Sequence, residues 1–252
     1  MLYSKISYKV IDFTRYTEAI TFRGERLNVL LPASIDMYLS GGKTHDSEIR
    51  LTRFLIQNLE WSHVFMDVGA HFGFYTLLAS HLLVKGTVYS VEAASRSFEI
   101  LKRNIEDKSN MVALNIAITE DDKPVEFYKF PTMYSEFNAL ENNQYANEGW
   151  YNSREMVNNT VKGKKGDTLI RELSLTPDFI KMVVEGAEDR VIRGFRNFLE
   201  YSVPIVVMEF SKTMRGNANH LAVDTLGKDF EYRPYLIDKE GQLKKIETKA
   251  DL

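Results

Sequence analysis

Residues 64–76, with the sequence VFMDVGAHFGFYT, decide the fold of this chain. The stretch reads as a buried apolar strand that ends in an acid, then a turn with two glycines four residues apart, and then a helix predicted over 75–83. Glycine lets a backbone approach a ligand closely, and the first turn of a helix presents unpaired N–H donors. This order of elements is typical of the entrance to a nucleotide-cofactor site in an α/β protein.

The composition is that of an ordinary globular protein and excludes several classes of function. The 252 residues suffice for one large α/β domain with a short extension. A formal net charge of −3 leaves no basic surface for nucleic acid, and the absence of cysteine excludes disulfides, thiol nucleophiles and cysteine-based zinc sites. We find neither the apolar core of a signal peptide nor an apolar run of the roughly 18 residues that a membrane helix needs, and so expect a cytoplasmic protein without a membrane span.

The spacing of apolar residues divides the chain near residue 45. Residues 1–45 alternate apolar and polar positions and predict a small N-terminal β extension, whereas 46–252 form the main domain and open with a helix. In the main domain, predicted strands at 64–68, 87–92, 112–118, 179–184 and 205–210 are separated by helical patterns, which indicates βαβ units and a mostly parallel sheet. The segments 232–237 and 242–246 predict a terminal antiparallel hairpin. Residues 131–165 are long for a connection, and we expect an insertion or substrate loop there.

Two acids stand at the ends of neighbouring predicted strands. Asp67 closes the first strand and Glu92 the second, so both should lie at the sheet edge where open α/β sheets bind ligands. Glu92 follows Gly69 by 23 residues, a spacing at which an acid accepts hydrogen bonds from both ribose hydroxyls of NAD or of S-adenosylmethionine. The turn lacks a full G-x-G-x-x-G for a pyrophosphate, and Asp67 would repel one but would tolerate a cationic methionine group. A capping or turn role for Asp67 is the structural alternative.

Six segments in the expected order resemble the FkbM-type methyltransferases. DVGAHFGFYT at 67–76 resembles D-V-G-A-N-x-G-x-Y-T, VEA at 91–93 resembles V-E-P, and 101–105 resembles L-x-x-N-I. AITE at 117–120 stands where the family has A-L-S-D, and DTL at 167–169 where it has D-x-L. The most specific segment, IKMVVEGAE at 180–188, stands where the family has I-K-I-D-V-E-G-A-E.

The resemblance implies a class I methyltransferase fold, Rossmann-like, with a seven-stranded mostly parallel sheet closed by the terminal hairpin, and residues 46–252 as the S-adenosylmethionine-binding domain. It also implies methyl transfer from S-adenosylmethionine to an oxygen, commonly a hydroxyl of a sugar, glycan or natural product. We expect a small-molecule or glycan partner, no nucleic acid, and a possible homo-oligomer. The expected cofactor-binding residues are Asp67, Gly69, Ala70, His71, Gly73, Tyr75, Thr76, Glu92, Ala93, Asn115, Ile116, Ala117 and Val183.

The reaction also needs an acceptor site and a base. We expect Glu185, just past a strand end, to be the base, with His71 as the competitor, while a carboxylate bonded to backbone N–H groups is the structural alternative for Glu185. Polar and aromatic residues of the insertion suit carbohydrate recognition, and the expected substrate residues are Tyr134, Asn138, Trp150 and Glu209. The histidines have no metal-binding spacing, so we expect no metal.

The chain departs from the family pattern at three positions. Val183 replaces an aspartate, Ala93 a proline and His71 an asparagine. Val183 removes whatever contact that acid makes, so a cofactor-binding protein that has lost methyl transfer is one alternative. An NAD-dependent oxidoreductase is the other.

Overall fold

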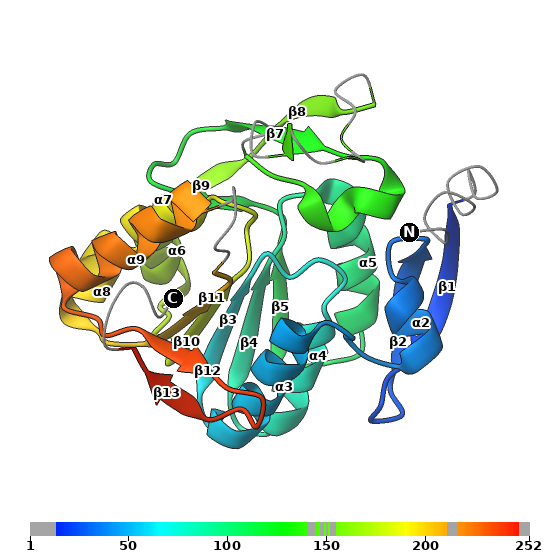
Figure 1. Ribbon diagram of the computed structural model, residues 1–252, viewed down its shortest axis with the longest axis horizontal. Coiled ribbons are helices and arrows are strands. Elements are labelled where there is room, and N and C mark those ends of the chain that lie inside the picture. The colour runs from blue at the N-terminus through cyan, green and yellow to red at the C-terminus, as the bar shows by residue number, and fades with distance from the viewer. Residues whose placement is uncertain are drawn as a thin grey trace.

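A five-stranded parallel sheet forms the centre of the structure (Figure 1). The structure is a computed structural model that describes residues 14–140, 145–146, 149, 151, 155–210 and 216–246, with backbone alone for 216–220. In spatial order the strands are β11 (Ile205–Met208), β10 (Phe179–Met182), β3 (Val64–Val68), β4 (Thr87–Val91) and β5 (Met111–Leu114). The order reverses between β3 and β10, which is where a doubly wound sheet opens a ligand crevice.

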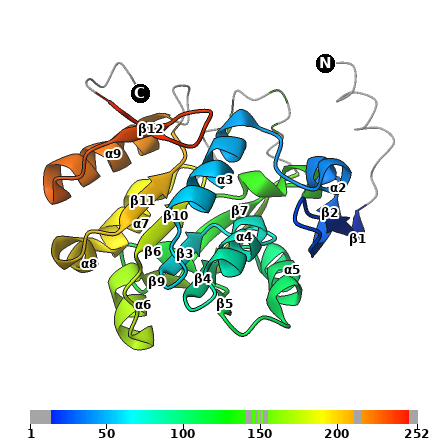
Figure 2. The same cartoon turned by 90° about the horizontal axis from the view of Figure 1, so that it is seen from below.

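Helices cover both faces of this sheet, because its buried strands are apolar on both sides. Figure 2 shows α3 (Asp46–Asn58), α4 (Phe74–Leu82) and α5 (Ser95–Ile105) on one side, with α6 (Gly166–Leu173), α7 (Glu188–Gly194), α8 (Arg196–Tyr201) and α9 (Gly216–Phe230) on the other. Alternate strand residues supply the two cores. Phe65 and Phe179 belong to the core under α3, α4 and α5, whereas Met66 and Ile180 belong to the core under α6 to α9.

The N-terminal extension contains the antiparallel pair expected from its alternating pattern. β1 (Arg15–Ile20) pairs with β2 (Arg26–Leu31), and α2 (Ile35–Ser40) follows. Leu27, Val29 and Leu30 are buried in the same core as α4 and α5. The pair therefore packs on the layer of α4 and α5 and shares its core. The predicted boundary at residue 45 stays a prediction.

The predicted count of seven strands in the main sheet is not confirmed, since five strands pair there among the described residues. The strand expected over 112–118 divides into β5 and β6 (Ala117–Thr119), because the chain leaves the sheet after Leu114, where the Asn115 amide turns back to hydrogen-bond the Glu92 and Ala93 carbonyls. β6 pairs with β9 (Gly163–Lys165), and β7 (Val125–Lys129) pairs with β8 (Val157–Val161). The described part of the 131–165 insertion thus contains β8, β9 and the 3-10 helix η1 (Thr132–Phe137).

The terminal hairpin is antiparallel as expected, but it does not extend the main sheet. β12 (Tyr235–Ile237) pairs with β13 (Leu243–Lys245) as a separate sheet beside α3 (Figure 1). Arg53 and Gln57 of α3 donate hydrogen bonds to the carbonyls of Lys239 and Glu240 in the hairpin turn. These bonds hold the hairpin against the helix. None of the helices in the described ranges has the length and hydropathy needed to cross a bilayer.

Candidate active site

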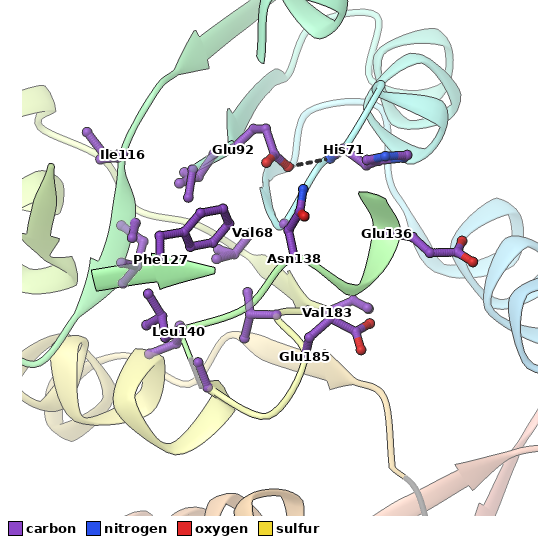
Figure 3. Close-up of a pocket in the computed structure, with 18 of the residues that line it drawn as sticks. Val68, His71, Glu92, Ile116, Phe127, Glu136, Asn138, Leu140, Val183 and Glu185 are labelled. Atoms are coloured by element: carbon purple, nitrogen blue, oxygen red, sulfur yellow. Dashed lines mark hydrogen bonds between the residues drawn. The ribbon is translucent and has the colours of Figure 1, made fainter. Parts of the chain in front are cut away.

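A pocket opens at the carboxyl ends of β3, β4 and β10, and the 131–140 segment passes over it (Figure 3). Seven of the expected cofactor residues line it together with two of the other expected site residues: Gly69, His71, Glu92, Ala93, Ile116, Ala117 and Val183, with Asn138 and Glu185. The topology therefore gathers residues that lie more than a hundred positions apart in the sequence.

The turn between β3 and α4 forms one wall. Gly69, His71 and Gly73 have φ values of +76°, +50° and +91°, a region that favours glycine. A Cβ on Gly69 would lie 2.0 Å from the Val183 carbonyl oxygen, so only glycine fits there. The N–H groups of Gly69 and Ala70 donate to the Val91 carbonyl at 2.9 and 3.0 Å. Ala70 and Gly73 shape this turn without lining the pocket.

Glu92 lies at the end of β4 and is buried. Its Oε2 accepts the His71 N–H at 2.8 Å, and its Oε1 accepts the Ala94 N–H at 2.8 Å. Burial raises the Glu92 pKa to about 7, although these two bonds oppose the shift. Each oxygen keeps a further lone pair, so the carboxylate can accept hydroxyl donors from a ligand in the pocket.

Asp67 lies on the other side of its strand from the pocket. Asp67 and Ser90 are register partners in β3 and β4, so Asp67 and Glu92 do share one edge of the sheet. The pleat nevertheless turns the buried Asp67 side chain toward α4, where Thr76 Oγ1 donates to Oδ2 and Lys181 Nζ donates to Oδ1, both at 2.8 Å. Through these contacts Asp67 links β3 to Thr76 of α4 and to Lys181 of β10. This arrangement corresponds to the capping or turn role given above as the structural alternative.

Three more expected cofactor residues are also placed outside the pocket wall. Thr76 is the hydroxyl that binds Asp67, and Tyr75 donates its OH to the Glu48 carbonyl at 3.2 Å. Asn115 bonds the carbonyls after β4 and so fixes the backbone around Glu92.

Glu185 lines the pocket on the side opposite Glu92 (Figure 3). It follows β10 with φ +54°, and Gly186 follows with φ +92°. Its Oε2 accepts the phenolic O–H of Tyr145 at 2.7 Å. Glu188, by contrast, uses Oε1 to accept the Val184 N–H at 3.2 Å, while burial raises its pKa to about 7.

His71 is a neutral imidazole. Its ring stacks on Phe72 with 3.7 Å between centroids, and Nε2 lies 3.2 Å from Ser135 Oγ. Burial, together with the charges of Lys43 and Lys181, lowers the His71 pKa to about 3. An imidazole with so low a pKa is a poor proton acceptor at neutral pH.

The expected substrate residues are dispersed. Asn138 lines the pocket, and its Oδ1 accepts the Phe130 N–H at 2.8 Å. Tyr134 packs near Phe137 in a small aromatic cluster of the insertion, and Glu209 is half-buried just past β11, outside the pocket wall. Trp150 lies outside the described residues.

Several wall residues escaped the sequence reasoning. Phe127, Ser135, Glu136 and Leu140 come from β7 and the 131–140 segment, which carry no motif. Lys181, which contacts Asp67 and the Gly69 carbonyl rather than lining the pocket, also escaped it, although it had a signal: a charge within the buried strand FIKM. No group of three acids or histidines in the described ranges could hold a metal ion.

The wall fits the two halves of an adenosine. Ile116, Phe127 and Leu140 give an apolar surface for a purine ring, and Glu92 supplies buried acceptors for ribose hydroxyls (Figure 3). Fold and pocket together define a Rossmann-like domain that binds a nucleoside cofactor at its switch point.

Residues 67–234 match the family model described as the Methyltransferase FkbM domain. The match covers well over half of the 252 residues, and the chain belongs to this family of methyltransferases, with S-adenosylmethionine as cofactor. This excludes the oxidoreductase alternative.

The solved structures that match the chain share little sequence with it. A precorrin-6y C5,15-methyltransferase from Geobacter metallireducens has 16% identity and a TM-score of 0.42, over 72% of this chain and 69% of that one. An O-methyltransferase from Bacillus cereus, in complex with SAH, has 12% identity and a TM-score of 0.43, over 77% and 74%. A putative rRNA-methylase from Clostridium thermocellum has 9% identity and a TM-score of 0.45, over 77% and 87%. No curated protein matches the sequence.

Proposed function

We propose that this methyltransferase transfers the methyl group to a hydroxyl oxygen of a sugar, glycan or natural product, with Glu185 as the base. The observation that carries the proposal is that Glu185 lines the pocket on the side opposite Glu92, with its carboxylate accepting a hydrogen bond from Tyr145. A neutral alcohol that is methylated must lose its proton, and a carboxylate in the pocket wall can receive it.

When bound, S-adenosylmethionine supplies an electrophilic methyl group on a sulfonium that leaves as a neutral thioether. Methylation of a hydroxyl oxygen would break the S–CH3 bond of the bound cofactor as the O–CH3 bond forms, and Glu185 would accept the hydroxyl proton. The rest of the site serves to hold the reactants in place, which lowers a barrier of this kind by roughly 7–11 kcal/mol in well-oriented cases. The low His71 pKa favours Glu185 over His71 as the base.

The acceptor side supports a hydroxylated acceptor. Ser135, Glu136 and Asn138 bring a hydroxyl, a carboxylate and an amide to the pocket wall, and such groups form hydrogen bonds to sugar hydroxyls. The aromatic rings of Tyr134 and Phe137, in the same segment, lie 6.5 Å apart. A cytoplasmic location and a homo-oligomer remain predictions from the sequence.

The test is transfer of labelled methyl groups to monosaccharides, oligosaccharides and hydroxylated small molecules, with amines and thiols as rival acceptors. We expect labelled ethers from hydroxylated acceptors. Transfer to amines alone would reject the proposed acceptor class, and tight cofactor binding without transfer to any acceptor would favour the binding protein that has lost turnover.

The base is tested with Glu185→Gln, which keeps the size of the side chain and removes its ability to accept a proton. We expect turnover to fall by about 10²-fold or more, with S-adenosylhomocysteine affinity within about two-fold of wild type. Glu126→Gln is the matched control, because Glu126 also accepts a tyrosine O–H, from Tyr128 at 3.2 Å, but lies exposed on β7. Equal turnover of the two variants would remove Glu185 from the role.

A further inference from the structure

A row of buried polar side chains crosses the sheet beneath the cofactor turn. Lys181 of β10 is the register partner of Asp67 of β3, and Asp67 is the register partner of Ser90 of β4. Thr76 of α4 closes the row, with its Oγ1 at 2.8 Å from both Asp67 Oδ2 and Ser90 Oγ. Lys181 is 3% exposed and the other three are fully buried. A buried ion pair contributes little net stability compared with apolar packing, so stability alone does not account for this row.

Lys181 also reaches the cofactor turn directly. Its Nζ donates to the Gly69 carbonyl at 2.9 Å, in addition to Asp67 Oδ1 at 2.8 Å. The opposite flank of the turn is held by β4, through the Val91 carbonyl and through Glu92, which accepts the His71 N–H. The turn is therefore attached on both sides, and Lys181 is its attachment to β10.

We propose that Lys181 is a positioning residue of the cofactor site, which holds the Gly69 carbonyl so that the turn presents the His71 N–H to Glu92. The alternative is that Lys181 only neutralises the negative charge of Asp67 and has no effect through Gly69. The two roles differ in one contact, because only positioning requires the hydrogen bond to Gly69. The inference rests on the cofactor and is independent of the acceptor, so failure of hydroxyl methylation would leave its test intact.

The test compares Lys181→Met with the double variant Lys181→Met/Asp67→Asn, by thermal unfolding and by calorimetric titration with S-adenosylhomocysteine. The single variant leaves a buried carboxylate without its cation, so its Tm should fall and its affinity should drop at least ten-fold. In the double variant the Tm should recover, while the affinity should stay at least ten-fold below wild type because Gly69 still lacks its donor. Ser90→Ala, at the far end of the row, is the control and should keep affinity within about two-fold.

A pH profile of binding separates the two effects further. The charged groups near Glu92 are Lys181, which lowers its pKa, and Asp67, which raises it, while the adjacent His71 is neutral. On acidification, the single variant should therefore lose affinity at a higher pH than wild type does. The double variant should lose it near the wild-type pH, from a lower plateau.

Wild-type affinity in the double variant would overturn the proposal and leave Lys181 as a charge partner only. If the methionine variants do not fold, Lys181→Gln in the Asp67→Asn background decides, since glutamine can still donate to the Gly69 carbonyl. Affinity within about three-fold of wild type supports positioning by that hydrogen bond, and a ten-fold loss contradicts it.

Discussion

At the scale of single residues, burial controls the ionisation of the groups around the pocket. Glu92 and Glu188 have pKa values raised to about 7, and His71 has one lowered to about 3, with desolvation as the largest cause in each case. Desolvation disfavours the charged form of every group, which moves acids up and histidine down. At neutral pH these three side chains therefore carry less charge than the same residues would carry in water.

His71→Asn tests this for the histidine, since asparagine tolerates the φ of +50° and does not titrate. The folded pKa of His71 is depressed below the unfolded value of 6.5, so its contribution to stability is present above pH 6.5 and is lost as the pH falls toward 3. Relative to wild type, the variant should thus gain on the order of a few kcal/mol in unfolding free energy on acidification across this window.

Urea unfolding of both proteins at pH 7 and at pH 5 measures the change. A difference in unfolding free energy that stays constant between these pH values would contradict a neutral, half-buried His71.

At the scale of elements, the β3–α4 turn is the most constrained part of the site. Gly69→Ala would combine a φ of +76° with a Cβ at 2.0 Å from the Val183 carbonyl, so the turn and β10 must separate. We expect a loss of about 3 kcal/mol or more in stability and no measurable S-adenosylhomocysteine binding.

Gly24→Ala measures the cost of the positive φ by itself, without a close contact to the new Cβ. Gly24 has a similar φ of +81°, but a Cβ there would meet nothing within 4 Å. Its cost should be about 1–2 kcal/mol, with cofactor affinity unchanged. Thermal unfolding and titration calorimetry on both variants make the comparison. Equal losses of unfolding free energy would show that the close approach to Val183 does not contribute to the cost of Gly69→Ala.

At the scale of the whole molecule, the N-terminal pair of strands is part of the main core. Leu27 of β2 is fully buried in one cluster with residues of α4 and α5, although the family match begins only at residue 67. Leu27→Ala should therefore cost about 2–5 kcal/mol and lower the Tm of the whole protein in a single transition.

Ile20→Ala is the matched control, because Ile20 lies in the partner strand and is 55% exposed. It should cost no more than about 0.5 kcal/mol. Circular dichroism during heating checks both variants. Two separate transitions in Leu27→Ala would instead indicate that the extension unfolds as an independent unit. That outcome would agree with the predicted domain boundary at residue 45.

Local patterns determined most of the elements. The helix that opens the main domain at residue 46, the helix predicted over 75–83 and the strand over 64–68 correspond to α3, α4 and β3, because apolar periodicity reports which face of an element is buried. The glycine turn and Glu92 were predictable for the same reason: backbone conformation and position at a strand end are properties of a short stretch.

Only the tertiary structure decided the rest, since it depends on contacts between distant segments. The sequence left open which side of β3 Asp67 would face, that Lys181 would meet it 114 residues further along, and that β12 and β13 would pair apart from the main sheet. Strand register and pleat set which side chains meet, and burial sets their charge. Both arise from the assembled sheet and its helices rather than from any one stretch of the chain.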